Sequence, residues 1–106
     1  MDNLEQLQVV VNEVQSARQQ VANLRAQVVE LEATIENVKN QPEELALHQQ
    51  MAGVLVEVSD RPKLIKELEE TLVALKEHLE RFTGREAELL ATYNQLKEML
   101  AGTENA

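Results

Sequence analysis

Two long stretches of the chain repeat their apolar residues every seven positions, and this repeat limits the folds that the sequence can adopt. In residues 7–38 an apolar side chain occupies every a and d position of the heptad. The a positions are Leu7, Val14, Val21, Val28 and Ile35, and the d positions are Val10, Ala17, Leu24, Leu31 and Val38. A strict seven-residue repeat keeps one apolar seam facing a partner helix, which is typical of a coiled coil.

A second heptad run covers residues 65–100, and only Glu86 breaks its apolar pattern. Its a positions are Ile65, Leu72, Leu79, Glu86, Tyr93 and Leu100, and its d positions are Leu68, Leu75, Phe82, Leu89 and Leu96. The two runs are similar in length and mirror each other about the segment between them. The sequence therefore predicts a helix that folds back antiparallel on the first, and a parallel coil of two chains is the alternative. In the antiparallel register Glu32 is expected near Glu69, which would be repulsive. The charges that flank the seam therefore do not distinguish the antiparallel hairpin from the parallel coil.

The first helix is predicted to cover residues 2–40. Asp2 followed three residues later by Glu5 is a capping-box pattern that opens a helix. Asn40 and Pro42 end it, because proline lacks the amide hydrogen and disfavours a helical conformation in the residue before it.

The second helix is predicted to cover residues 61–101. Asp60 is a good N-cap, and Pro62 is tolerated in a first helical turn. Gly102 is expected to close the helix and to leave a frayed tail of residues 102–106.

The segment between the heptad runs has the period-two pattern of β-strands. Val54, Val56 and Val58 alternate with other residues, and a similar alternation precedes them in residues 45–51. Gly53 stands between the two runs, where a tight turn needs positive φ. The sequence therefore predicts a β-hairpin over residues 45–59 at the bend.

This hairpin has a consequence for assembly. A two-stranded hairpin is marginal in water, and both of its edges offer unpaired backbone groups. Since the chain has no other predicted strand, we expect its hairpin to join hairpins of other subunits. The residues expected in that assembly are Leu47, Met51, Val54, Leu55, Val56 and Val58.

Composition excludes several other classes of protein. With 106 residues the chain is long enough for a single domain, and its net charge of −9 with ten dispersed basic residues argues against nucleic acid as a partner. No apolar run approaches the ~20 residues that span a bilayer, and the N-terminus lacks a signal-peptide pattern. Because cysteine is absent as well, a cytoplasmic location without membrane contact is expected.

No residue pattern indicates catalysis or a cofactor. His48 and His78 are the two imidazoles, and neither has carboxylates at metal-ligand spacing on both sides. The acidic cluster of Glu67, Glu69 and Glu70 is a solvated face near a helix N-terminus, where the helix dipole favours negative charge. The chain also lacks a phosphate-binding glycine loop. We expect no enzyme, no metal and no cofactor.

The segment from Leu47 to Val58, LHQQMAGVLVEV, resembles the hairpin of β-type prefoldin subunits. The following SDRPKLIKELEETLVALKEHLE resembles the acidic entry to that family's second helix. The layout covers nearly the whole chain, and the specific motif covers residues 42–75. Two departures are a turn glycine that comes one position late and coils that are slightly short. The bend has room for one hairpin, whereas α-type subunits carry two, so the resemblance favours the β-type.

The resemblance implies a function that residue patterns alone do not. Prefoldin is a hexamer of α-type and β-type chains whose strands form a barrel platform from which coiled coils project. Its coil tips hold unfolded proteins without ATP and pass them to a group II chaperonin in the archaeal or eukaryotic cytosol. The partners expected here are therefore an α-type subunit, further copies of this chain, unfolded proteins and a group II chaperonin.

At the chain ends, which would form the tip, apolar residues exceed what the seam requires. Exposed and adaptable apolar surface suits the holding of diverse clients. Val11 and Leu90 alternatively only widen the seam. The residues expected to contact clients are Leu4, Leu7, Val9, Val11, Leu90, Leu96, Met99 and Leu100.

Glu86 lies on the predicted seam opposite Ala17. Because an unpaired buried carboxylate is costly, Arg18 or Arg85 is expected to supply the opposite charge. Gly84 adds a helix cost of about 1 kcal/mol relative to alanine. This weak place is either a local packing defect or a hinge.

The competing interpretation is a structural coiled-coil adaptor or spacer of a larger complex, with an ordinary loop at the bend. A membrane-surface helix is disfavoured by the scarcity of basic residues. The chaperone and adaptor interpretations differ at residues 45–58, because a spacer has no use for alternating valines.

Overall fold

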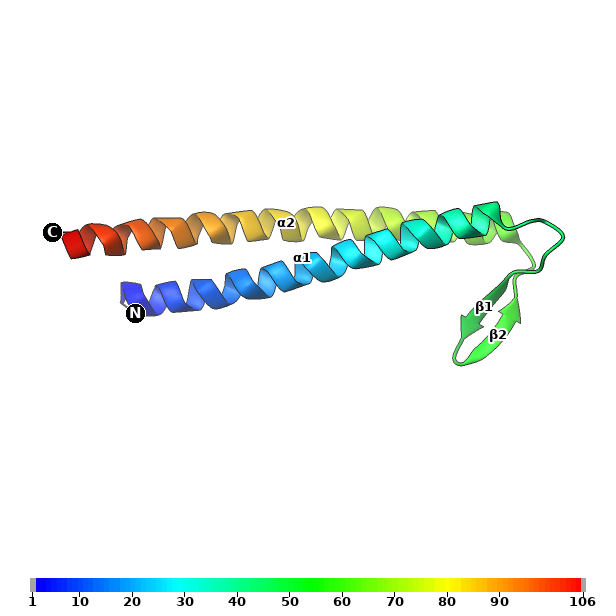
Figure 1. Cartoon of the computed structure of the whole chain (residues 1–106), viewed down its shortest axis with the longest axis horizontal. Coiled ribbons are helices and arrows are strands. Elements are labelled where there is room, and N and C mark those ends of the chain that lie inside the picture. The colour runs from blue at the N-terminus through cyan, green and yellow to red at the C-terminus, as the bar shows by residue number, and fades with distance from the viewer. Residues whose placement is uncertain (1, 106) are drawn as a thin grey trace. The chain divides into compact units, whose positions relative to one another are not determined.

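The structure, a computed structural model, describes residues 2–105, with side chains described for residues 2–102. Along the chain it contains α1 (Asn3–Asn40), β1 (His48–Met51), β2 (Val54–Glu57) and α2 (Arg61–Asn105) (Figure 1). The two strands pair antiparallel. The predicted fold class, mainly helical with a small β-hairpin between two long helices, is confirmed.

The chain divides into two compact units, and the boundary between them cuts both helices. The terminal unit consists of Met1–Arg25 with Glu77–Ala106, and the hairpin unit is Ala26–Lys76. Each unit contains a stretch of α1 beside a stretch of α2 that runs in the opposite direction (Figure 1). The hairpin unit also contains both strands. That residues 1–106 form a single domain stays a prediction.

The a and d positions of the heptads form the apolar core of both units. Every a and d residue of the two runs is buried or half-buried. The most enclosed side chains are Val14, Ala17 and Val21 in the terminal unit and Val28 and Ile35 in the hairpin unit. Full burial of a valine or isoleucine side chain stabilises a fold by about 1.5–3 kcal/mol. The stacked layers of the seam are therefore the main source of stability.

Helix α1 begins as its capping residue predicts. The Asp2 carboxylate accepts a hydrogen bond from the Glu5 amide at 2.8 Å, and the Asp2 carbonyl accepts one from the Gln6 amide at 3.0 Å. The helix ends at Asn40, and the Pro42 carbonyl accepts the Leu45 amide at 3.1 Å in a turn. Helix propagation stops here because Pro42 offers no backbone donor.

Helix α2 begins as predicted and ends later than predicted. The Asp60 carboxylate accepts the Lys63 amide at 3.1 Å, and the Asp60 carbonyl accepts the Leu64 amide at 3.1 Å. The helix continues to Asn105, so the predicted end at residue 101 and the frayed tail from Gly102 are wrong. A glycine inside a helix keeps its amide donor and costs only about 1 kcal/mol, and no proline follows it. Position 106 of that tail lies outside the described residues.

A two-residue turn joins the strands. Ala52 has φ 51° and Gly53 has φ 82°, so both central residues lie in the left-handed region that a type I′ turn requires. Glycine adopts this region freely, whereas a residue with a Cβ loses roughly 1–2 kcal/mol there. The sequence pattern had assigned positive φ to Gly53 alone. Both strands lie inside the predicted range 45–59.

Candidate functional site

The pairing register of the hairpin sorts its side chains onto two faces. The Cα partners are His48 with Glu57, Gln49 with Val56, Gln50 with Leu55, and Met51 with Val54. A hydrogen bond of 2.9 Å from the Val58 amide to the Leu47 carbonyl extends the ladder by one more pair. Directly opposed residues of an antiparallel pair project from the same face of the sheet. One face, the apolar strand face, therefore carries Leu47, Gln49, Met51, Val54, Val56 and Val58.

Five of the six residues expected to take part in assembly lie on the apolar strand face. Leu55 is the exception, since its partner is Gln50 and it shares the other face with His48 and Glu57. The face is unusually open, because Met51 is 56% exposed and Val54 is 60% exposed. Within the described chain the sheet has two strands, so each strand has one edge without a backbone partner.

Arg61 anchors the connection that leads from α1 into the hairpin. Its guanidinium donates to the carbonyl oxygens of Gln41 at 2.6 Å, Pro42 at 3.4 Å and Leu45 at 2.9 Å. These carbonyls follow the end of α1 and lack helical partners, so one side chain satisfies several of them. Arg61 is not among the residues that the sequence predicts for this site. The available signal was a cation in the first turn of a helix, where the helix dipole disfavours positive charge.

The residues expected to contact clients fall into two groups in the terminal unit. Leu4 is 68% exposed, Val9 is 42% exposed and Met99 is 52% exposed. The remaining five are half-buried, namely Leu7, Val11, Leu90, Leu96 and Leu100. Exposed apolar surface in this unit thus comes from the first group, and the second group belongs to the seam or its border.

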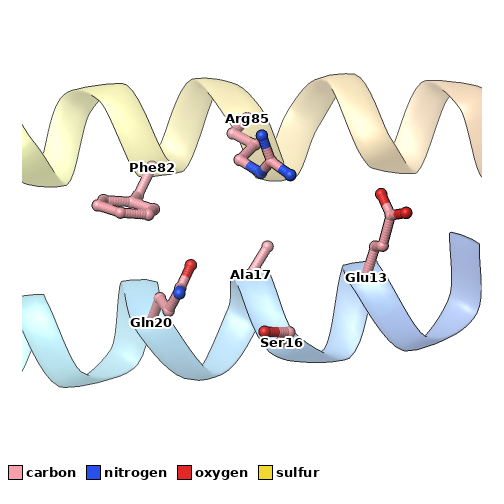
Figure 2. A pocket seen from close by; sticks show the side chains of 6 residues that line it. All are labelled: Glu13, Ser16, Ala17, Gln20, Phe82 and Arg85. Carbon is pink, nitrogen blue, oxygen red and sulfur yellow. The ribbon is translucent and has the colours of Figure 1, made fainter.

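A shallow depression lies on each side of the seam in the terminal unit. On the side of the heptad e positions, the e side, it has a volume of ≈ 340 Å³ and is lined by Val11, Val14, Gln15, Arg18, Leu90 and Tyr93. On the side of the g positions, the g side, it has a volume of ≈ 260 Å³ and is lined by Glu13, Ser16, Ala17, Gln20, Phe82 and Arg85. Figure 2 shows this second lining, with Phe82 and Arg85 on α2 facing four residues of α1. The e side is the more aliphatic of the two.

Glu86 interrupts the apolar seam as the heptad predicts, and its carboxylate lies close to an arginine. Its carboxylate lies 3.9 Å from Nε of Arg18, and 23% of its side chain is exposed. Ala17 beside it is 2% exposed, so this layer of the core holds one methyl group where other layers hold branched side chains. Arg85, the other residue expected to reach Glu86, lines the g-side depression (Figure 2). The hinge and the local packing defect both stay predictions.

Ion pairs flank the seam in the hairpin unit. Nζ of Lys39 lies 2.9 Å from the Glu69 carboxylate, and Nζ of Lys76 lies 3.9 Å from the Glu32 carboxylate. The hydrogen bond and the charge of Glu69 raise the pKa of Lys39 above its ordinary value of 10.5. The expected proximity of Glu32 and Glu69 is therefore replaced by two attractive pairs.

Comparison with known proteins decides the family. A family profile described as "Prefoldin subunit" matches residues 1–103. The chain belongs to the prefoldin subunit family. Prefoldin is a chaperone, so the chain is a chaperone subunit, and the resemblance in the hairpin sequence is confirmed. A search of the curated proteins finds no match.

Solved prefoldin structures share the fold. The prefoldin beta subunit from Thermococcus strain KS-1 is similar over 95% of this chain and 88% of its own length, with a TM-score of 0.85 and 18% identity. The prefoldin beta2 subunit from the same strain is similar over 89% of this chain and 99% of its own length, with a TM-score of 0.75 and 19% identity. The fold is thus that of β-type prefoldin subunits.

The described residues contain neither a candidate membrane span nor a candidate metal-binding cluster. Within residues 2–105 neither helix contains an apolar stretch long enough to cross a bilayer. The same residues include no group of three or more histidine, aspartate or glutamate side chains arranged to hold a metal ion.

Proposed function

We propose that this chain is a β-type prefoldin subunit that assembles through its hairpin and holds unfolded proteins on its terminal unit without ATP. The observation that carries the proposal is the apolar strand face, which is one-sided and exposed. Such a face, next to unpaired backbone edges, is suited to pairing with strands of other chains. The partners proposed are an α-type prefoldin subunit and further copies of this chain.

Assembly accounts for the cost of keeping aliphatic side chains in water. Val54, Val56 and Met51 are all exposed in the chain by itself. Each such side chain gains about 1.5–3 kcal/mol when it is fully buried, so a subunit interface over this face offsets a large part of the cost of association. The single hairpin at the bend supports the β-type assignment. Leu55, which lies on the other face, would lie at the rim of the proposed interface.

Client holding is proposed for the exposed apolar residues of the terminal unit. Leu4, Val9 and Met99 present aliphatic surface without an enclosing pocket. An open surface of this kind contacts diverse apolar segments because it excludes no particular side chain. Held clients would then pass to a group II chaperonin in the cytosol, and the chain would act without a cofactor and without catalysing a reaction.

The direct test is the light-scattering mass of the chain alone and after mixing with an α-type prefoldin subunit. The proposal predicts a shift to a particle of hexamer size, and the mixture should suppress aggregation of an unfolded client without ATP. A chain that ignores the α-type subunit would instead support a structural adaptor.

A pair of matched variants locates the assembly surface. Val54→Thr with Val56→Thr keeps strand-forming β-branched residues but places hydroxyls on the apolar strand face, and it should abolish the shift in mass. Val29→Thr with Val73→Thr makes the same chemical change at two exposed helical valines of the same unit, and it should assemble normally. If the two double variants gave the same shift in mass on mixing, the assembly interface would lie elsewhere.

A further inference from the structure

The e side of the terminal unit differs in charge from the chain as a whole. The chain has a net charge of −9. Among the described side chains at e positions and the adjoining b positions of this unit, the cations are Arg18, Arg25 and Lys97, and the carboxylate is Glu80. All four are exposed. Glu86, at a core position, adds a partly exposed carboxylate 3.9 Å from Arg18. Cations still outnumber carboxylates on this side of an acidic protein.

The same side is apolar between its charges. Val11 and Leu90 border the depression of ≈ 340 Å³, and Tyr93 and Val14 form its base. Nζ of Lys97 lies 5.9 Å from the centroid of the Tyr93 ring, which keeps a cation beside the aliphatic lining. Leu4, another e-position residue, adds a 68% exposed side chain.

The g side of the same unit also carries exposed apolar side chains, at Val9 and Met99, but it lacks the excess of cations. Its depression is lined by four polar or charged residues, Glu13, Ser16, Gln20 and Arg85, and by Ala17 and Phe82 (Figure 2). The g and c positions also include the carboxylates of Asp2 and Glu88, so acidic groups offset the basic ones there. The two sides of one coiled coil thus offer different surfaces to a ligand.

We infer that the e side of the terminal unit preferentially holds apolar segments of non-native proteins that carry acidic side chains next to their apolar residues. This inference rests on the proposed client-holding function and names the class of segment held. The aliphatic residues supply contact area that does not depend on sequence, and the cations select by charge complementarity. Arg18 keeps donors for a ligand, because Glu86 is 3.9 Å from its Nε and 60% of its side chain is exposed.

The test uses the 106-residue chain and two labelled peptides that share one apolar core. One peptide carries aspartate and glutamate on both flanks of the core, and the other carries lysine and arginine. Exposed opposite charges contribute up to about 1 kcal/mol per pair, so binding at low salt should be roughly fivefold tighter for the acidic peptide. The preference should fall at high ionic strength because salt screens exposed charges.

Two charge-matched variants locate the preference. Arg25→Glu with Lys97→Glu changes the e side without removing the partner of Glu86. Arg81→Glu with Arg85→Glu makes the same change in net charge on the g side. The first variant should lose the acidic preference and the second should keep it, and thermal unfolding followed by circular dichroism checks that both fold.

The outcomes separate this inference from the function beneath it. Equal affinity of the unmodified chain for both peptides overturns the inference and leaves client holding intact, because the peptides still bind. Equal loss of preference in both variants overturns it as well, since net charge would then explain the effect. A change in the light-scattering mass of the free chain caused by Arg25→Glu with Lys97→Glu would show that a second copy of the chain occupies the face. Failure to bind either peptide or any unfolded client would contradict the proposed function itself.

Discussion

The residues that flank the seam are used differently in the hairpin unit and in the terminal unit. In the hairpin unit the e positions of the two helices carry opposite charges, and they meet as Lys39 with Glu69 and Glu32 with Lys76. Each cation has an anion across the seam. The e-position charges of this unit are thereby paired within the unit.

In the terminal unit the e positions that pair in the same register have no carboxylate opposite a cation: Arg25 is opposite Thr83, and two further cations are opposite aliphatic residues. Arg18 and Leu90 line one depression, and the next pair of e positions along the coil is Val11 with Lys97. Neither aliphatic residue can neutralise a charge. Arg18 pairs with the core residue Glu86 at 3.9 Å, and no described e-position carboxylate lies opposite Arg25 or Lys97. This difference in charge pairing is the basis of the ligand-binding surface inferred for the terminal unit.

The first prediction tests whether the seam itself is alike in the two units. Ile35→Ala in the hairpin unit removes a side chain that is 6% exposed and should lower the free energy of unfolding by about 2–4 kcal/mol. Val21→Ala, at a residue 2% exposed in the terminal unit, should also destabilise the chain, by less because fewer methyl groups are lost. Thermal and denaturant unfolding measure both. A loss below about 1 kcal/mol for Ile35→Ala would contradict the burial of that layer.

The second prediction concerns the weak layer of the terminal unit. Glu86→Leu should fill the space beside Ala17 with apolar volume and stabilise the unit by about 1–2 kcal/mol. Amide hydrogen exchange in residues 82–88 of the unmodified chain should be faster than in the flanking heptads, and the variant should slow it. Glu88→Leu, at an exposed position nearby, is the control and should leave the exchange unchanged. If the amides of residues 77–100 in the unmodified chain were equally protected from exchange, the layer at Glu86 would not be weaker than its neighbours.

The third prediction concerns the hairpin turn alone. Ala52→Gly should stabilise the hairpin by about 1 kcal/mol, because it relieves the left-handed conformation of a residue with a Cβ. Gly53→Ala should have the opposite effect, since Gly53 also has positive φ. Exchange protection of the Val58 amide, which bonds to the Leu47 carbonyl, reports on both. Loss of protection in Ala52→Gly would show that the turn has another conformation.

The smallest expected effect is the titration of Lys39. Its raised pKa means that the ion pair with Glu69 stabilises the fold fully below pH 10.5, and that this contribution is lost as the pH rises through the higher folded value. NMR titration of the Lys39 side chain should show the raised pKa, and Glu69→Gln should lower it. The matched change Glu67→Gln, on the same helix, should leave the pKa of Lys39 unaltered.

Sequence reasoning predicted the seam well because the heptad repeat depends only on local spacing. All a and d residues, from Leu7 to Leu100, are buried or half-buried as that spacing requires. The hairpin was equally predictable, since alternating valines next to a glycine are typical of a strand that follows a tight turn. The late end of α2 is not predictable in the same way, because a glycine is common just past a helix end, whereas Gly102 weakens the helix without ending it.

The contacts across the seam were harder to predict, and side-chain direction explains why. Side chains in a helix lean toward the N-terminus of their own helix. In an antiparallel pair these directions oppose each other, so Glu32 leans toward Lys76 and not toward Glu69, which lies closer in register. Arg61 was missed for a different reason, because its partners Gln41 and Leu45 are distant in sequence and are backbone carbonyls. No residue pattern records such partners.

In the proposed function, client binding belongs to the terminal unit and assembly belongs to the hairpin unit. The most direct measurement is suppression of client aggregation by complexes that contain one of two matched variants. Leu4→Ser with Val9→Ser alters exposed aliphatic residues of the terminal unit, and Val29→Ser with Val73→Ser alters exposed aliphatic residues of the hairpin unit. Both should form particles of unchanged mass. The account predicts weaker protection by the first variant alone, and it would be contradicted if that variant protected the client as well as the unmodified chain does.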